Sequence, residues 1–181
     1  MLQNNNTSKI LKCFFDNPSK RFQLRELSRI TKLSTTAVKF ALLELLKQKS
    51  ILKVIENKYH FYESNKEDEN YKFLKKFYNV KLLKESGLID FLDKEFNYPE
   101  AVILFGSASR GEDVENSDFD VFVLTSNKKD FNLEHFEKKL NKSIKIFLMD
   151  RNDFELAKKK NPELINNIIN GIIIKGYLEA V

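Results

Sequence analysis

The spacing of apolar residues changes along the chain, and each change predicts a different element. In the first third, apolar residues recur every three or four positions in three successive segments. Two runs rich in β-branched and aromatic residues, 51–55 and 59–63, follow and are separated by three polar residues. This part of the sequence predicts three helices, which begin after Ser8, at Phe22 and at Thr35, and then a β-hairpin.

Beyond residue 64, helical spacing alternates with short apolar runs. Helical spacing continues on both sides of Gly87, over residues 71–83 and 88–96. Short apolar runs that predict strands occupy residues 101–105, 118–124 and 144–149. Further helical patterns occupy residues 133–140, 153–160 and 162–169. The chain therefore predicts an α+β fold with a small sheet in its second part.

The polar segment NKEDE at residues 65–69 separates the helix-and-hairpin part from the remainder. We predict three regions: 1–64, with three helices and the hairpin; 65–98, with linker helices; and 99–181, with the sheet.

Charge is distributed unequally between these regions. The chain has a net charge of +5, but residues 1–63 carry 12 Lys and Arg against 5 Asp and Glu, a net charge of +7. The remaining residues carry a net charge of −2. A basic first third is typical of a module that binds nucleic acid.

Other features of the composition limit the cellular setting. A single cysteine excludes a disulfide framework and a cysteine zinc site, and it fits a reducing compartment. The first residues are mostly polar, and aliphatic runs such as 172–174 are far too short to span a bilayer. We expect a cytoplasmic protein without a membrane partner.

Candidate chemistry is concentrated in residues 101–124, AVILFGSASRGEDVENSDFDVFVL. Gly106 ends the buried strand and lets the backbone approach a ligand, and Ser107 adds a hydroxyl at a helix start, so this turn can bind phosphate. Asp118 and Asp120 are two positions apart and leave the same face of a strand. Two such carboxylates suit Mg²⁺.

Gly106-Ser107, ten residues and then Asp118-Phe119-Asp120 resemble the GS-x10-DxD signature of the DNA polymerase β nucleotidyltransferase superfamily. The longer string is similar to its minimal nucleotidyltransferases, in which Arg110, Gly111 and Ser117 also belong to the pattern. The resemblance implies a mixed sheet and a nucleoside triphosphate substrate. It also implies that four residues bind the nucleotide: Gly106, Ser107, Arg110 and Ser117. It further implies that Asp118 and Asp120 are catalytic and hold Mg²⁺ or Mn²⁺, and that Arg110 also offsets developing charge.

The first third, with LSTTAVKFALLELLKQKSIL at its centre, resembles a winged helix-turn-helix. That resemblance implies duplex DNA as a partner. The residues expected at the DNA are Arg21, Arg25, Thr35, Thr36, Lys39, Lys53 and Lys58. The alternative is a helical module for homodimerisation or for docking a partner protein, which the large apolar residues Phe40 and Leu43 on the same side favour.

The whole arrangement resembles prokaryotic, particularly archaeal, nucleotidyltransferases that carry an amino-terminal winged helix. One position departs from the family pattern, because Lys145 stands where active members have a third carboxylate. Two functions stay open. In the first, the protein is a nucleotidyltransferase that modifies a hydroxyl acceptor, which could be a protein such as a toxin. Alternatively, it is a DNA-binding, antitoxin-like regulator whose second domain only binds nucleotide or a partner.

Overall fold

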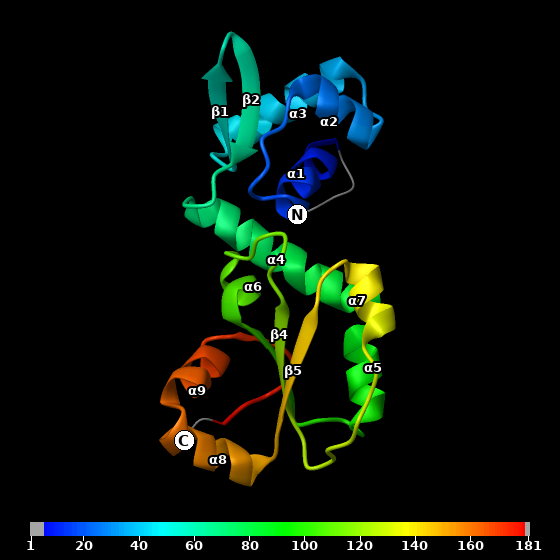
Figure 1. The fold of residues 1–181 in the computed structure, drawn as a ribbon, viewed down its shortest axis with the longest axis vertical. Helices are drawn as coiled ribbons and strands as arrows, with labels where there is room; N and C mark the ends of the chain where they lie inside the picture. Colours follow the sequence, from blue (N-terminus) through cyan, green and yellow to red (C-terminus); the bar gives the residue numbers. More distant parts are fainter. Residues whose placement is uncertain (1–5, 180–181) are drawn as a thin grey trace. The chain divides into compact units, whose positions relative to one another are not determined.

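The computed structural model describes residues 6–179, and the chain divides into two compact units, Met1–Lys75 and Lys76–Val181 (Figure 1). The division falls within one long helix, α4 (Glu69–Ser86). Residues 1–5, with most of the polar start, and residues 180–181 lie outside the described residues. Every helix among the described residues is too short or too polar to cross a bilayer.

Three helices and a hairpin form most of the first unit, as the apolar spacing predicted. The elements are α1 (Asn6–Asp16), α2 (Leu24–Thr31), α3 (Thr35–Lys47), β1 (Ile51–Glu56) and β2 (Tyr59–Ser64). β1 and β2 pair antiparallel. The prediction that the second helix starts at Phe22 was wrong, because Phe22 forms a β-bridge with Tyr62 through two backbone hydrogen bonds of 2.8 Å.

The start of α4 belongs to the first unit, because its side chains donate hydrogen bonds to the last carbonyls of α1. The last carbonyls of a helix have no partner within that helix. The Phe14 carbonyl accepts from the hydroxyls of Ser64 at 3.2 Å and Tyr71 at 3.4 Å, and the buried Lys75 ammonium donates to the Phe15 carbonyl. Phe14 also packs edge-on against Phe22 with ring centroids 5.2 Å apart.

A four-stranded mixed sheet forms the centre of the second unit, in the order β5-β4-β3-β6. β4 and β5 are parallel, while β3 pairs antiparallel with β4 and with β6. The strands are β3 (Ala101–Phe105), β4 (Phe119–Leu124), β5 (Ile144–Met149) and β6 (Ile172–Gly176). The helices after α4 are α5 (Leu88–Glu95), α6 (Gly106–Arg110), α7 (Glu134–Leu140), α8 (Arg151–Lys160) and α9 (Pro162–Ile169).

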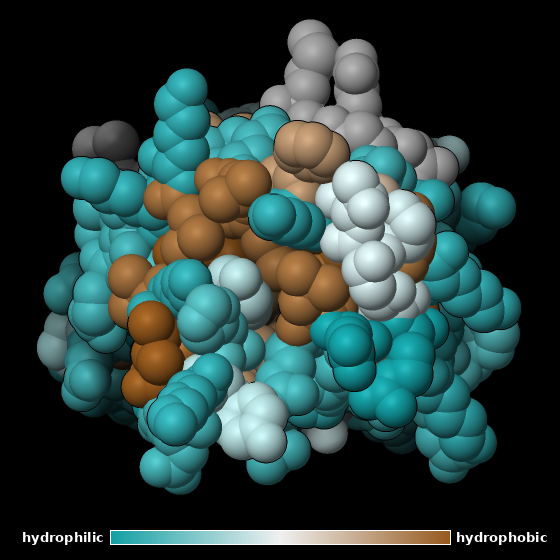
Figure 2. Space-filling model, turned by 90° about the horizontal axis from the view of Figure 1, so that it is seen from above, coloured by the Kyte–Doolittle hydropathy of each residue, from teal (hydrophilic) through white to brown (hydrophobic). Residues whose placement is uncertain are grey.

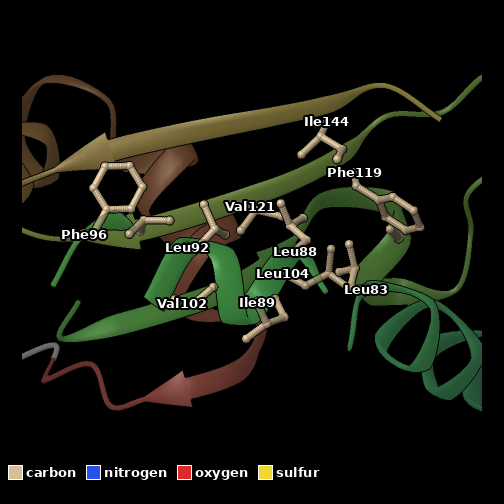
Figure 3. Close-up of a cluster of buried hydrophobic side chains, with 12 residues drawn as sticks. Leu83, Leu88, Ile89, Leu92, Phe96, Val102, Leu104, Phe119, Val121 and Ile144 are labelled. Atoms are coloured by element: carbon tan, nitrogen blue, oxygen red, sulfur yellow. The ribbon is translucent and has the colours of Figure 1, made fainter. Parts of the chain in front are cut away.

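Apolar side chains cover both faces of this sheet, because alternate residues of a strand point to opposite faces. On one face, Val102, Leu104 and Val121 pack with Leu88 and Leu92 of α5 (Figure 3). The alternate residues of these strands point to the other face, where they pack against buried residues of α8 and α9. That second cluster contains Ala101, Ile103, Phe105, Phe122, Leu124, Phe154, Ile165 and Ile168.

Candidate functional site

The turn from β3 into α6 depends on a glycine. Gly106 has a φ of +70°, in the left-handed region that other residues adopt at a cost. A Cβ at this position would overlap the Oδ2 atom of Asp120 and would lie 3.3 Å from its Cγ. The absence of a side chain therefore brings the backbone at the start of α6 directly against the Asp120 carboxylate.

Asp118 and Asp120 lie at the same end of the sheet as this turn. Asp120 is paired with Phe105 on β3 and with Lys145 on β5. β4 begins at Phe119, one residue later than predicted, so Asp118 directly precedes the strand. Burial raises the pKa of Asp120, and the Asp118 charge adds to this effect, whereas the charges of Lys145 and Arg110 oppose it. Asp120 is therefore a half-buried carboxylate whose charge is incompletely compensated.

Lys145 provides the compensating charge for Asp118. Its Nζ atom lies 2.5 Å from Asp118 Oδ2, and this hydrogen bond raises the pKa of Lys145. The lysine side chain is 61% exposed, whereas that of Asp118 is 29% exposed. Lys145 thus lies on β5 beside both aspartates, paired with Asp120 across the strands and in contact with Asp118.

The donor set fits one hard divalent ion better than two. Residues 6–179 contain no group of three or more His, Cys, Asp or Glu side chains that could hold a metal. Asp150, just beyond β5, caps α8 by accepting from the Asp153 amide at 2.8 Å and pairs with Lys128 at 2.9 Å. Two carboxylates leave the other positions of a Mg²⁺ ion to water and phosphate oxygens, which is usual for this ion.

A buried polar network fixes the loop between α6 and β4. The Asn79 amide donates to Asp113 Oδ1 at 2.6 Å and to the Ala108 carbonyl at 3.0 Å. Lys142 pairs with Asp113 at 3.2 Å and donates to the Val114 carbonyl at 2.8 Å. Sequence reasoning missed this network; its only signal was an asparagine among the apolar residues of α4.

The other predicted nucleotide-site residues lie on α6 or in this loop. Ser107 is in the first turn of α6, and its carbonyl accepts from the Glu112 amide at 3.0 Å. Arg110 is exposed and pairs with Glu112 at 2.8 Å. The Ser117 hydroxyl accepts from the Val114 amide at 2.9 Å, so it closes the turn that leads to Asp118.

The basic residues predicted to contact DNA differ in their surroundings. Arg21 is held by Glu56 and by Glu63, the latter at 2.6 Å, so it braces the hairpin. No described residue forms an ion pair with any of four other exposed basic residues: Arg25, Lys39, Lys53 and Lys58. Thr35 and Thr36 are exposed in the first turn of α3, which Ser34 caps by accepting from the Ala37 amide at 3.2 Å.

Large apolar residues are also exposed on the first unit. Phe40 and Leu43 of α3 are 68% and 53% exposed, as expected from the sequence. Figure 2 shows brown apolar side chains in several groups, with hydrophilic side chains between them. The exposed large apolar residues of α2, α3 and the hairpin are Ile30, Phe40, Leu43, Leu52, Ile55 and Tyr59, and Phe73 is exposed on α4.

Comparison with known proteins identifies the second unit. The profile of the family described as "Polymerase beta, Nucleotidyltransferase" matches residues 86–178, half of the chain. A crystal structure of a protein from Sulfolobus solfataricus, described as a putative nucleotidyltransferase, is similar over 59% of this chain and 92% of that chain, with 18% identity and a TM-score of 0.34. No curated protein matches the chain. The matched residues include the Gly106 turn, both aspartates and Lys145, and the chain belongs to the polymerase β nucleotidyltransferase family.

Proposed function

We propose that the second unit transfers a nucleoside monophosphate from a nucleoside triphosphate to a hydroxyl acceptor. The observation that carries the proposal is the close approach of the Gly106 backbone to Asp120, beside Asp118, at one end of the sheet. This arrangement combines a phosphate-binding turn with two carboxylates in a protein of the nucleotidyltransferase family.

Each residue has a role in this proposal. Asp118 and Asp120 would hold Mg²⁺ or Mn²⁺, and a bound ion supplies positive charge that neutralises and orients the phosphates. The Ser107 hydroxyl and the amides that follow Gly106 bind the terminal phosphates, and Ser117 supports the nucleotide from the adjoining loop. Arg110 offsets the charge that develops as the acceptor oxygen attacks the α-phosphate and pyrophosphate leaves.

The proposed transfer lacks one group that could activate the acceptor. A third carboxylate would help to remove the proton of the acceptor hydroxyl, but β5 carries Lys145 at that position. The acceptor must therefore bring or meet a base elsewhere, as a hydroxyl on a partner protein such as a toxin could do. The alternative function is an antitoxin-like regulator in which the same site binds nucleotide without transferring it.

The test separates binding from transfer. With Mg²⁺, the best of ATP, GTP, CTP and UTP should raise the melting temperature of the wild type by mass action. The double variant Asp118→Asn/Asp120→Asn should fold but lose this shift. Transfer itself is measured with α-labelled triphosphates, with and without the product of the neighbouring gene. An equal melting shift in the double variant would contradict the proposed site.

We further propose that the first unit is a winged helix that binds duplex DNA. The supporting observation is that Thr35, Thr36 and Lys39 are exposed on a capped α3. The expected contacts also include Arg21, Arg25 on the preceding helix, and two hairpin lysines. Those lysines are Lys53 and Lys58. Side chains at the amino-terminal end of such a helix read base edges, while the basic residues contact phosphates.

Salt dependence tests the DNA proposal. Binding should weaken with a log–log slope of about −0.9 for each phosphate contact. Lys39→Glu should weaken binding further, whereas Lys138→Glu, a change on exposed α7 of the second unit, serves as the control. Absent or salt-insensitive binding would instead favour homodimerisation or protein docking through the exposed Phe40 and Leu43.

A further inference from the structure

Three adjacent strands align their functional groups in one row. Phe105, the residue before the Gly106 turn, is paired with Asp120, and Asp120 is paired with Lys145. Neighbouring strands are about 4.8 Å apart, so Lys145 is two strand spacings from the phosphate-binding turn. Its side chain is 61% exposed and long enough to turn along this row.

Lys145 and a divalent ion require the same carboxylate. The ammonium already occupies Asp118 Oδ2 at 2.5 Å. An ion held between Asp118 and Asp120 would bring two positive charges against the ammonium, and like charges at such distances repel. This repulsion favours a state in which Lys145 has left Asp118 when both carboxylates hold the ion.

A nucleotide provides the displaced ammonium with a new partner. The phosphate chain carries several negative charges, and a mobile lysine ammonium is a common phosphate ligand. Without a nucleotide, the displaced ammonium would face only water and the incoming ion. Without a metal ion, the nucleotide phosphates would face the Asp120 charge uncompensated.

We propose that Lys145 is a built-in cation that leaves Asp118 for the phosphates when a divalent ion and a nucleotide bind together. The site then holds one divalent ion, and metal and nucleotide bind cooperatively. This inference rests on the proposed nucleotide site and deepens it, because it assigns the metal count and a role to a residue that departs from the family pattern.

The experiment compares Lys145→Met with the wild type. Free Mn²⁺ is measured by electron paramagnetic resonance in titrations without nucleotide and with the triphosphate that gives the largest melting shift. The matched control is Lys175→Met, because Lys175 is also a strand lysine, lies 2.5 Å from Asp93 Oδ2 and is 42% exposed. Lys145→Arg retains the positive charge as a second control.

Opposite changes in two affinities are expected. Lys145→Met should bind Mn²⁺ alone about threefold to tenfold more tightly than the wild type, because an exposed competing ion pair is removed. The same variant should bind the triphosphate more weakly, and the factor by which nucleotide tightens Mn²⁺ binding should fall severalfold. Lys175→Met should change neither affinity, and Lys145→Arg should resemble the wild type.

The outcomes distinguish this inference from the function on which it rests. If the wild type binds Mn²⁺ and triphosphate through the aspartate pair, but Lys145→Met has the wild-type affinities and coupling, Lys145 is not the built-in cation. Two Mn²⁺ ions per wild-type chain would also overturn the inference while leaving the nucleotide site intact. If the triphosphate binds neither wild type nor variant, the proposed function fails and the inference fails with it.

Discussion

Replacing Gly106 by alanine should destabilise the second unit and disturb its site at the same time. An alanine at φ +70° has a conformational cost of about 1–2 kcal/mol. The new Cβ would also overlap the Asp120 carboxylate, and such overpacking adds about 1–3 kcal/mol. The free energy of unfolding should therefore fall by about 2–5 kcal/mol.

Gly87 is the matched control for this change. It also lies in the second unit with a positive φ, +87°, but a Cβ there would have no atom within 4 Å. Gly87→Ala should therefore cost only the conformational term of about 1–2 kcal/mol. Urea unfolding of both variants, followed by circular dichroism, gives the two costs from the same transition.

The variant Asp120→Ala isolates the contact between residue 106 and the Asp120 carboxylate. In Asp120→Ala, the overlap is absent, so adding Gly106→Ala should cost no more than Gly87→Ala does in the wild type. Gly106→Ala alone should also weaken the melting shift produced by Mg²⁺ and triphosphate, because it displaces Asp120. Equal costs for the two alanine variants, together with an unchanged melting shift, would refute the close approach.

Two further predictions concern polar groups near the site. Asp113→Ala should lower the free energy of unfolding by about 3–5 kcal/mol, because it leaves Lys142 and the Asn79 amide without their buried partner. Urea unfolding of the single variants and of the double variant with Asn79→Ala should show non-additive costs, and additive costs would contradict a shared network. The hydrogen bond from the Asp153 amide and the Lys128 charge lower the pKa of Asp150. The Asp150 carboxylate therefore stabilises the folded protein above the unfolded pKa of about 4, and this contribution is lost as the pH falls through the lower folded pKa. Asp150→Asn should therefore be less stable than the wild type at pH 7, and the difference, measured by urea unfolding, should shrink as the pH falls below the unfolded pKa of about 4. A difference that stays constant into strong acid would rule out the carboxylate charge as its cause.

Local sequence patterns predicted most elements of the fold. The sequence placed β5 at its observed residues, because its alternation of apolar residues reports directly which side chains face the core. The same two-residue period predicted that Lys145 shares a face with Asp118 and Asp120, and the structure confirms it. The family profile confirms the nucleotidyltransferase domain, whereas the DNA contacts stay a prediction.

Contacts between distant segments could not be predicted in this way. The β-bridge of Phe22 with Tyr62 is a pairing across forty residues, so the helical spacing of the segment gave no sign of it. Arg21 had the character of a phosphate ligand in the sequence, but the hairpin brings Glu56 and Glu63 against it. In each case the partner is supplied by tertiary structure, which residue type and spacing alone do not specify.

The two aspartates of the site are unequal, and the inequality bears on how a metal ion would enter. The Lys145 ammonium lies 2.5 Å from Asp118. Burial raises the pKa of Asp120 and the Asp118 charge adds to this rise, while the charges of Lys145 and Arg110 oppose it. A divalent ion at the proposed site would therefore gain most from Asp120, with which no described residue forms an ion pair, and would compete with Lys145 for Asp118. In the mechanism proposed for Lys145, the phosphates of a nucleotide offer the lysine a new partner, so the second carboxylate would become available when the nucleotide binds. Lys145 would thereby link metal coordination to occupancy of the proposed nucleotide site.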